Sequence, residues 1–173
     1  MNTILHALAC YNSNVNLELA GILREMPAEK LSAKTGAYFP TILDAAVHIL
    51  ISDINMVKRF KTAFPESIAL GSTLLLSDDT ARIKKEAESG LEKFLDYRKQ
   101  LDPVISAFVD ELDGETLDFI IKYNNYRGEP VEAAAWKLLL TIFNHQAHHR
   151  GGISVMLDIA GVKNDFSGTL AKI

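Results

Sequence analysis

Three of the five histidines in this 173-residue chain lie in one short segment, residues 144–150. In a helix, His145 and His149 would be about 40° apart around the axis and one turn apart along it. Two imidazoles placed this way can direct nitrogen atoms to one point, as two ligands of a metal ion must. His148 is rotated about 100° from His149 and is expected to face elsewhere.

Another histidine, His48, lies in a segment that is otherwise dominated by apolar residues. An imidazole buried there without a partner costs about 1–3 kcal/mol. A metal ion shared with His145 and His149 would supply that partner. Three histidines leave one coordination position open, as is usual for a catalytic zinc site. The alternatives are that His145 and His149 are a surface pair at helical spacing and that His48 is a hydrogen-bonded core histidine.

Other motifs for metal or nucleotide chemistry do not fit the chain. A zincin requires Glu directly after the first histidine, where this chain has Gln146. A ferritin-like di-iron site requires Glu three residues before a histidine on each of two helices, and no histidine here has one. The sequence also has no glycine-rich nucleotide-binding fingerprint and no G-x-S-x-G nucleophile elbow.

The elements that must position these histidines are helices. Apolar residues at spacings of three and four predict a helix over 4–24, which ends before Pro27. A second helix is expected to begin after Thr41, which can cap it together with Asp44 three residues on. The apolar period of this helix then continues until Pro65.

The second half of the chain is predicted to add two more helices. One covers 77–101, with a short helical piece over 103–112, and the last runs over 131–159. Between them, the alternating pattern of 117–126 favours a half-buried strand. We therefore predict an all-α fold, a bundle of four main helices with a short extended or hairpin excursion before the last helix, in a single domain over 1–173.

Composition limits the class of protein. The chain is 48% hydrophobic and 23% charged, which is typical of a soluble globule and excludes wholesale disorder. A net charge of −4 argues against nucleic acid as a partner, because phosphate binding needs a surplus of Lys and Arg. The single cysteine, Cys10, cannot form an intramolecular disulfide. We find no signal peptide and no apolar run that could span a membrane, so a cytoplasmic location without membrane contact is expected.

These residues also carry a family resemblance. The segment 145–151 is similar to the H-x-x-H-H-R-G-Q signature of the DinB-like (damage-inducible, YfiT-like) superfamily of metal-dependent enzymes, and the likeness covers nearly the whole chain. The segment 40–53 resembles that superfamily's second helix, in which one histidine is the first metal ligand and an Asp follows. Residues 126–128 resemble its hairpin. Gly152 stands where the family usually has Gln.

The resemblance implies a metal site and a class of reaction. His48, His145 and His149 match the three ligands of a divalent transition metal, with zinc or nickel expected, and His148 matches a position that is not a ligand. Relatives include transferases and isomerases that use bacillithiol, mycothiol or glutathione. The implied function is a thiol-dependent S-transferase or a hydrolase that acts on a small molecule, with a low-molecular-weight thiol as cosubstrate. The alternative is a metal-binding bundle without turnover that has a stress role.

Three further residues near the histidines have candidate roles. Asp44, one turn before His48, either supports the metal site from behind its ligands or is only the helix cap. Asp53 faces about 140° away from His48 and is not expected to be a ligand. Arg150 either holds an anionic group of the substrate or forms a salt bridge on the helix surface.

A homodimer is expected from the family and from the second predicted helix. The family commonly pairs through helices of the bundle. A helix that is apolar on most sides is buried on most sides, and residues 42–51 leave little room for a solvated face. A second copy would cover the extra face. The alternative is that the hairpin or the connection over 64–76 covers it.

Overall fold

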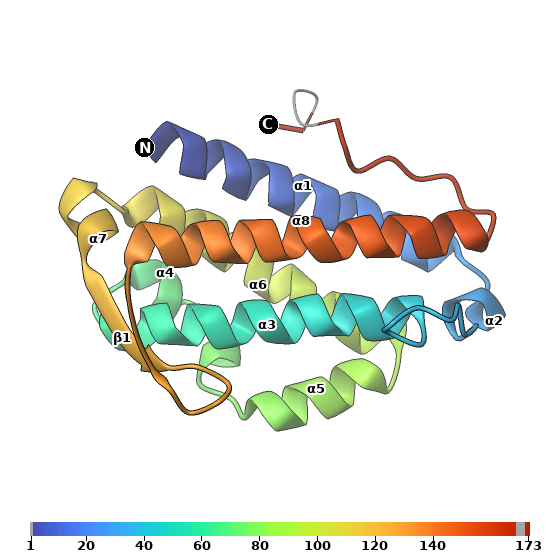
Figure 1. Ribbon diagram of the computed structural model, residues 1–173, viewed down its shortest axis with the longest axis horizontal. Coiled ribbons are helices and arrows are strands. Elements are labelled where there is room, and N and C mark those ends of the chain that lie inside the picture. The colour runs from blue at the N-terminus through green and yellow to red at the C-terminus, as the bar shows by residue number, and fades with distance from the viewer. Residues whose placement is uncertain (1, 169–171) are drawn as a thin grey trace.

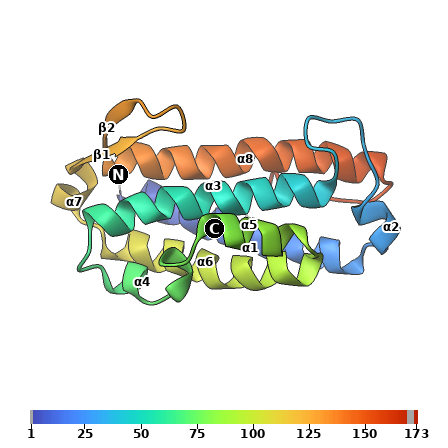
Figure 2. The same ribbon diagram turned by 90° about the horizontal axis from the view of Figure 1, so that it is seen from below.

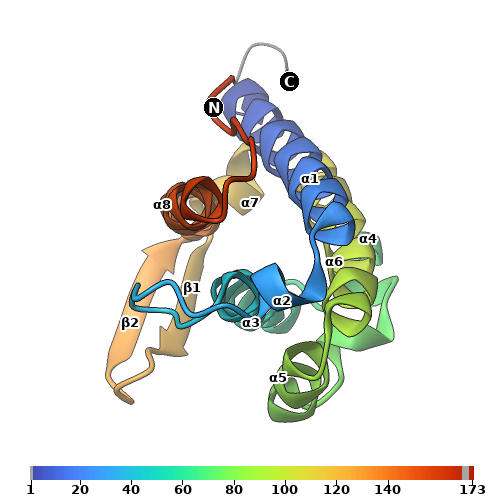
Figure 3. The same ribbon diagram turned by 90° about the vertical axis from the view of Figure 1, so that its right-hand side faces the viewer.

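The computed structural model describes residues 2–168 and 172–173. Within this part of the chain, four long helices form a bundle (Figure 1): α1 (Asn2–Glu25), α3 (Ile42–Ala63), α6 (Leu91–Glu111) and α8 (Ala135–Ile159). Viewed along the long axis, α1 and α3 lie at opposite corners, with α6 and α8 between them (Figure 3). The predicted all-α bundle is confirmed.

Helix α3 begins where the sequence predicts. The hydroxyl of Thr41 accepts a hydrogen bond from the backbone N–H of Asp44 at 3.1 Å, and the Asp44 carboxylate accepts one from the backbone N–H of Thr41 at 3.0 Å. This capping box satisfies two N–H groups that the first turn of a helix leaves without partners. Asp44 is therefore engaged as the helix cap.

The third predicted helix is wrong as a single element, because the chain forms α5 (Thr80–Glu88) and then the longer α6. Gly90 lies at the break, and glycine costs about 1 kcal/mol relative to alanine inside a helix. The separate piece predicted over 103–112 is also wrong, since α6 continues through Pro103. The burial of apolar side chains on both sides of the proline outweighs the one hydrogen bond that the proline removes. These buried side chains are Leu101, Val104, Ile105 and Phe108.

The excursion before the last helix is a hairpin. A short helix, α7 (Gly114–Asp118), precedes β1 (Ile120–Asn124), which pairs antiparallel with β2 (Pro130–Ala134). Gly128 allows the turn between them, with φ of +79°. Because β2 takes the residues up to Ala134, helix α8 begins at Ala135, and the predicted start near residue 131 is wrong.

The helices share one apolar core, which includes Leu23, Leu50, Phe60 and Phe143. Short elements complete the connections: α2 (Ala28–Leu31), α4 (Ile68–Gly71) and the 3-10 helix η1 (Leu74–Leu76). In the described part of the chain, no helix is both long enough and apolar enough to cross a membrane.

Helix α3 is covered on several sides by its own chain. It packs against α8, α5, α6 and β1, and Figure 2 shows α5 lying along it. Ala45, Val47, Ile49 and Leu50 are all at most 3% exposed. These contacts account for its apolar composition without a second chain.

Homodimerisation therefore stays a prediction that rests on the family resemblance. Light scattering at micromolar concentration is expected to give twice the 19.1 kDa mass of one chain. A mass near 19.1 kDa would contradict the dimer.

Candidate metal centre

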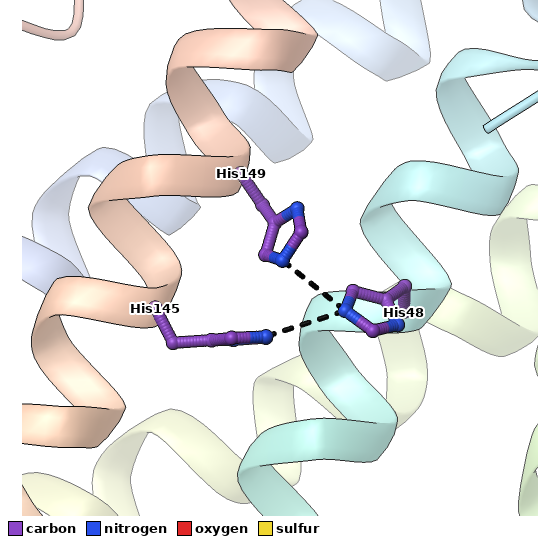
Figure 4. Close-up of side chains that lie close together, drawn as sticks. All are labelled: His48, His145 and His149. Atoms are coloured by element: carbon purple, nitrogen blue, oxygen red, sulfur yellow. Dashed lines mark hydrogen bonds between the residues drawn. The ribbon is translucent and has the colours of Figure 1, made fainter. Parts of the chain in front are cut away.

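Two antiparallel helices bring the three predicted histidines together. His48 comes from the second turn of α3, and His145 and His149 come from successive turns of α8, so all three rings enter the space between these helices (Figure 4). The Nε2 atom of His48 lies 3.2 Å from the Nε2 atoms of both His145 and His149. One ligand atom from each residue lies within 4.8 Å of the others.

This arrangement fits a metal ion better than a set of hydrogen bonds. A neutral imidazole has one N–H, so the Nε2 of His48 can donate to only one of the two nitrogens that it faces. A tetrahedral ion with ligand nitrogens at 2.0–2.1 Å separates those nitrogens by about 3.3 Å. The observed separations of 3.2 Å are close to this value. The three residues can therefore hold a metal ion, and a fourth position would remain for water or substrate.

The electrostatics of the centre keep the imidazoles neutral, as metal ligands must be. Partial burial lowers the pKa of His145 to about 4, with further lowering by His149 and His148. Burial also lowers the pKa of His149 to about 4, with His48 and His148 as smaller causes. The pKa of His48 is lowered by burial and by His145. At neutral pH, each ring therefore offers a lone pair.

Two residues that sequence reasoning missed also face the centre. The ring of Phe39 lies 4.7 Å from the ring of His48 and 5.5 Å from that of His149, measured between centroids. The hydroxyl of Ser52 lies 3.4 Å from the Nε2 of His145. Ser52 follows His48 by four residues, and this helical spacing is a signal that could have identified it. Phe39 lies in an irregular segment, where no period indicates direction.

Comparison with known proteins agrees with this geometry. The family model described as "DinB family" matches residues 1–167. The chain belongs to the DinB family. It is 25% identical to the protein named "Protein DinB" of Bacillus subtilis (strain 168) over 152 residues, which cover 87% of this chain and 83% of that protein. No solved structure gives a significant match.

In this DinB-family protein, Asp53 and His148 are not among the residues whose ligand atoms converge. The Asp53 carboxylate is 1% exposed and accepts a hydrogen bond from Arg98 of α6 at 2.6 Å. His148 is exposed and is not among the residues whose ligand atoms converge. Both positions agree with the rotation that the helical period predicts.

Arg150 differs from both of its predicted roles. It is only 1% exposed, and its guanidinium donates to the side-chain oxygens of Asn12 at 2.5 Å, Gln146 at 2.9 Å and Asn16 at 3.3 Å. It therefore neither holds a substrate anion nor forms a surface salt bridge. It ties α8 to α1 through a buried polar network, at the position that follows His149 in the chain.

The lowered histidine pKa values predict a pH-dependent stability. Unfolded histidines titrate near 6.5, so between about pH 6.5 and 4 the unfolded chain binds protons that folded His145 and His149 do not. The free energy of unfolding of chelator-treated protein is therefore expected to fall as the pH is lowered from 7 to 5. Thermal melts at several pH values measure this, with a loss of several degrees expected.

A double variant isolates the cause. His145→Gln with His149→Gln is expected to lose most of this pH slope, whereas His6→Gln, at a surface residue paired with Asp110, keeps it. Burial raises the pKa of Asp53 to about 6, and this shift makes the free energy of unfolding rise as the pH is lowered. The wild type, the double variant and His6→Gln all retain Asp53, so its effect is the same in each. An unchanged slope in the double variant would contradict the prediction.

Proposed function

We propose that this DinB-family protein is a metal-dependent enzyme whose divalent ion, zinc or nickel, is held by His48, His145 and His149. The observation that carries the proposal is the convergence of three neutral imidazoles, in which the Nε2 atom of His48 lies 3.2 Å from the Nε2 atoms of both His145 and His149. Imidazole ligands suit zinc and nickel. Three protein ligands with a fourth position open are typical of catalytic sites, whereas structural zinc is closed by four.

The proposed reaction is a thiol-dependent S-transfer or a hydrolysis on a small molecule. When bound, a divalent ion lowers the pKa of a thiol or water in its open position and so supplies a nucleophile near neutral pH. The residues around it have supporting roles. Phe39 covers one side of the His48 and His149 rings and limits water there. The Ser52 hydroxyl offers a hydrogen bond beside His145.

An activity panel tests this proposal. Metal-loaded protein is incubated with electrophiles in the presence and absence of low-molecular-weight thiols, and with hydrolysable esters and amides. Turnover is expected that disappears after chelation and in His145→Ala. The control, His6→Ala at a surface residue of α1, keeps it. If the metal-loaded protein turns over none of these compounds, the enzyme proposal is overturned. The alternative, a metal-binding protein without turnover in a stress role, is then favoured.

A further inference from the structure

A cavity of about 350 Å³ opens beside the three histidines. It lies between the segment 37–39, which precedes α3, and the C-terminal half of α8, and His149 forms part of its wall. We call this cavity the apolar recess. Its volume is within the range of small-molecule sites in proteins, which is about 300–1,000 Å³. The recess is therefore large enough to hold part of a ligand whose other end reaches the metal position.

The walls of the apolar recess are mostly hydrocarbon. Phe39, Ala45, Ile153 and Met156 supply apolar surface, and the exposed ring of Tyr38 packs edge-on against Phe39 at 5.0 Å. The imidazoles of His148 and His149 are the ionisable groups of the wall, apart from the Tyr38 phenol. None of the described residues that line it is Asp, Glu, Lys or Arg. A charged group that entered it would lose water without gaining an ionic partner, which is unfavourable. An uncharged apolar group would gain from burial.

Gly152 forms one part of the recess wall and contributes no side chain to it. Gly152 follows His149 by three residues and lies on the same face of α8. A Cβ atom built on Gly152 would meet no other atom within 4 Å, so the space in front of it is free. A larger residue here would fit α8 and would fill part of the recess. Gly151 also has free space but does not line the recess.

We propose that the substrate of this centre carries an uncharged, compact apolar group, about the size of a phenyl ring, which binds in the apolar recess beside Gly152. The polar reacting end of the same molecule would lie at the open metal position next to His149. Phe39 contributes to both parts, since its ring touches His48 and His149 and also lines the recess. This inference rests on the proposed function and adds the chemical class of the substrate.

Three hydroxamates with the same metal-binding head test the proposal. Acetohydroxamate, benzohydroxamate and 4-carboxybenzohydroxamate are titrated by calorimetry into zinc-loaded protein whose metal content has been measured. Benzohydroxamate is expected to bind about 10-fold or more tightly than acetohydroxamate, because its ring is buried. The carboxylate is expected to remove most of that gain, because a charge enters an apolar space.

Two matched variants locate the effect. Gly152→Leu fills the recess and is expected to reduce the preference for benzohydroxamate to about threefold or less, with the metal content and acetohydroxamate affinity unchanged. Gly151→Leu places the same side chain on the adjacent position of α8 and is expected to keep the preference.

The outcomes separate the two proposals. With metal bound, equal affinity for acetohydroxamate and benzohydroxamate, or an unchanged preference in Gly152→Leu, would overturn the apolar recess as the substrate site and leave the metal centre standing. Failure to bind metal would overturn the proposed function, and this inference with it.

Discussion

Alanine at His145 or at His149 is expected to abolish the binding of a divalent metal ion. Elemental analysis of the wild-type protein should find about one transition-metal ion per chain. Each of these residues supplies one of three converging Nε2 atoms, and two imidazoles rarely retain an ion of the catalytic type. Loss of an outer-shell partner alone lowers metal affinity about 10–100-fold, so loss of a ligand should cost on the order of 100-fold or more.

The chain contains its own control for this experiment. His148 is next to His149, is exposed, and lies outside the converging set, so His148→Ala is expected to keep the metal. His48→Ala should also lose the metal ion, as the His145 and His149 variants do, although His48 lies on α3 and not on α8. A protein in which His148→Ala loses the ion and His149→Ala retains it would contradict the ligand assignment.

Arg98→Met is expected to lower the free energy of unfolding by about 3–5 kcal/mol. The guanidinium side chain is 6% exposed and donates at 2.6 Å to both Asp53 and Asp102. Without it, Asp53 would lose the ion pair that lowers the pKa of its buried carboxyl group. The group would then either remain as a poorly paired charge or take up a proton in the core, and removing one member of a buried pair is costly for that reason. Urea denaturation followed by circular dichroism measures the change.

A surface ion pair supplies the comparison. Lys122 and Glu132 lie across the hairpin at 2.8 Å with both side chains more than half exposed, so Lys122→Met should change stability by less than about 1 kcal/mol. Replacing Asp53 with Leu in the Arg98→Met protein is expected to recover part of the loss, because the buried carboxyl group without its arginine is removed. An Arg98→Met protein within 1 kcal/mol of wild type would contradict the argument.

The parts of this protein that follow a helical period could be predicted from its sequence. His145 and His149 share a face because they are four residues apart, and the same rule excluded His148. The start of α3 could be placed because Thr41 and Asp44 form a local capping motif whose partners lie within one turn. His48 was linked to the α8 pair by its polarity in an apolar segment, and the structure brings the three rings together.

The features that sequence reasoning missed depend on contacts between distant segments. The residues of β2 have no strand signal of their own, and they become a strand by pairing with β1. The role of Arg150 depends on Asn12 and Asn16, which are more than 130 positions away on α1. A local pattern carries no information about such partners, so a buried arginine could not be distinguished from an exposed one.

The packing of α1 and α3 sets the order in which the protein can assemble during synthesis. Helix α1 packs mainly on α6 and α8, and α3 packs on α8 and α6 as well as on α5, which lies at the middle of the chain. The faces that α6 and α8 cover therefore stay exposed while the first half of the chain emerges from the ribosome. His48 must wait for His145, which is 97 residues further along, so contacts of high sequence separation close late. The three-histidine centre is accordingly completed only when α8 docks, and a nascent chain that lacks this helix has neither the centre nor a finished core.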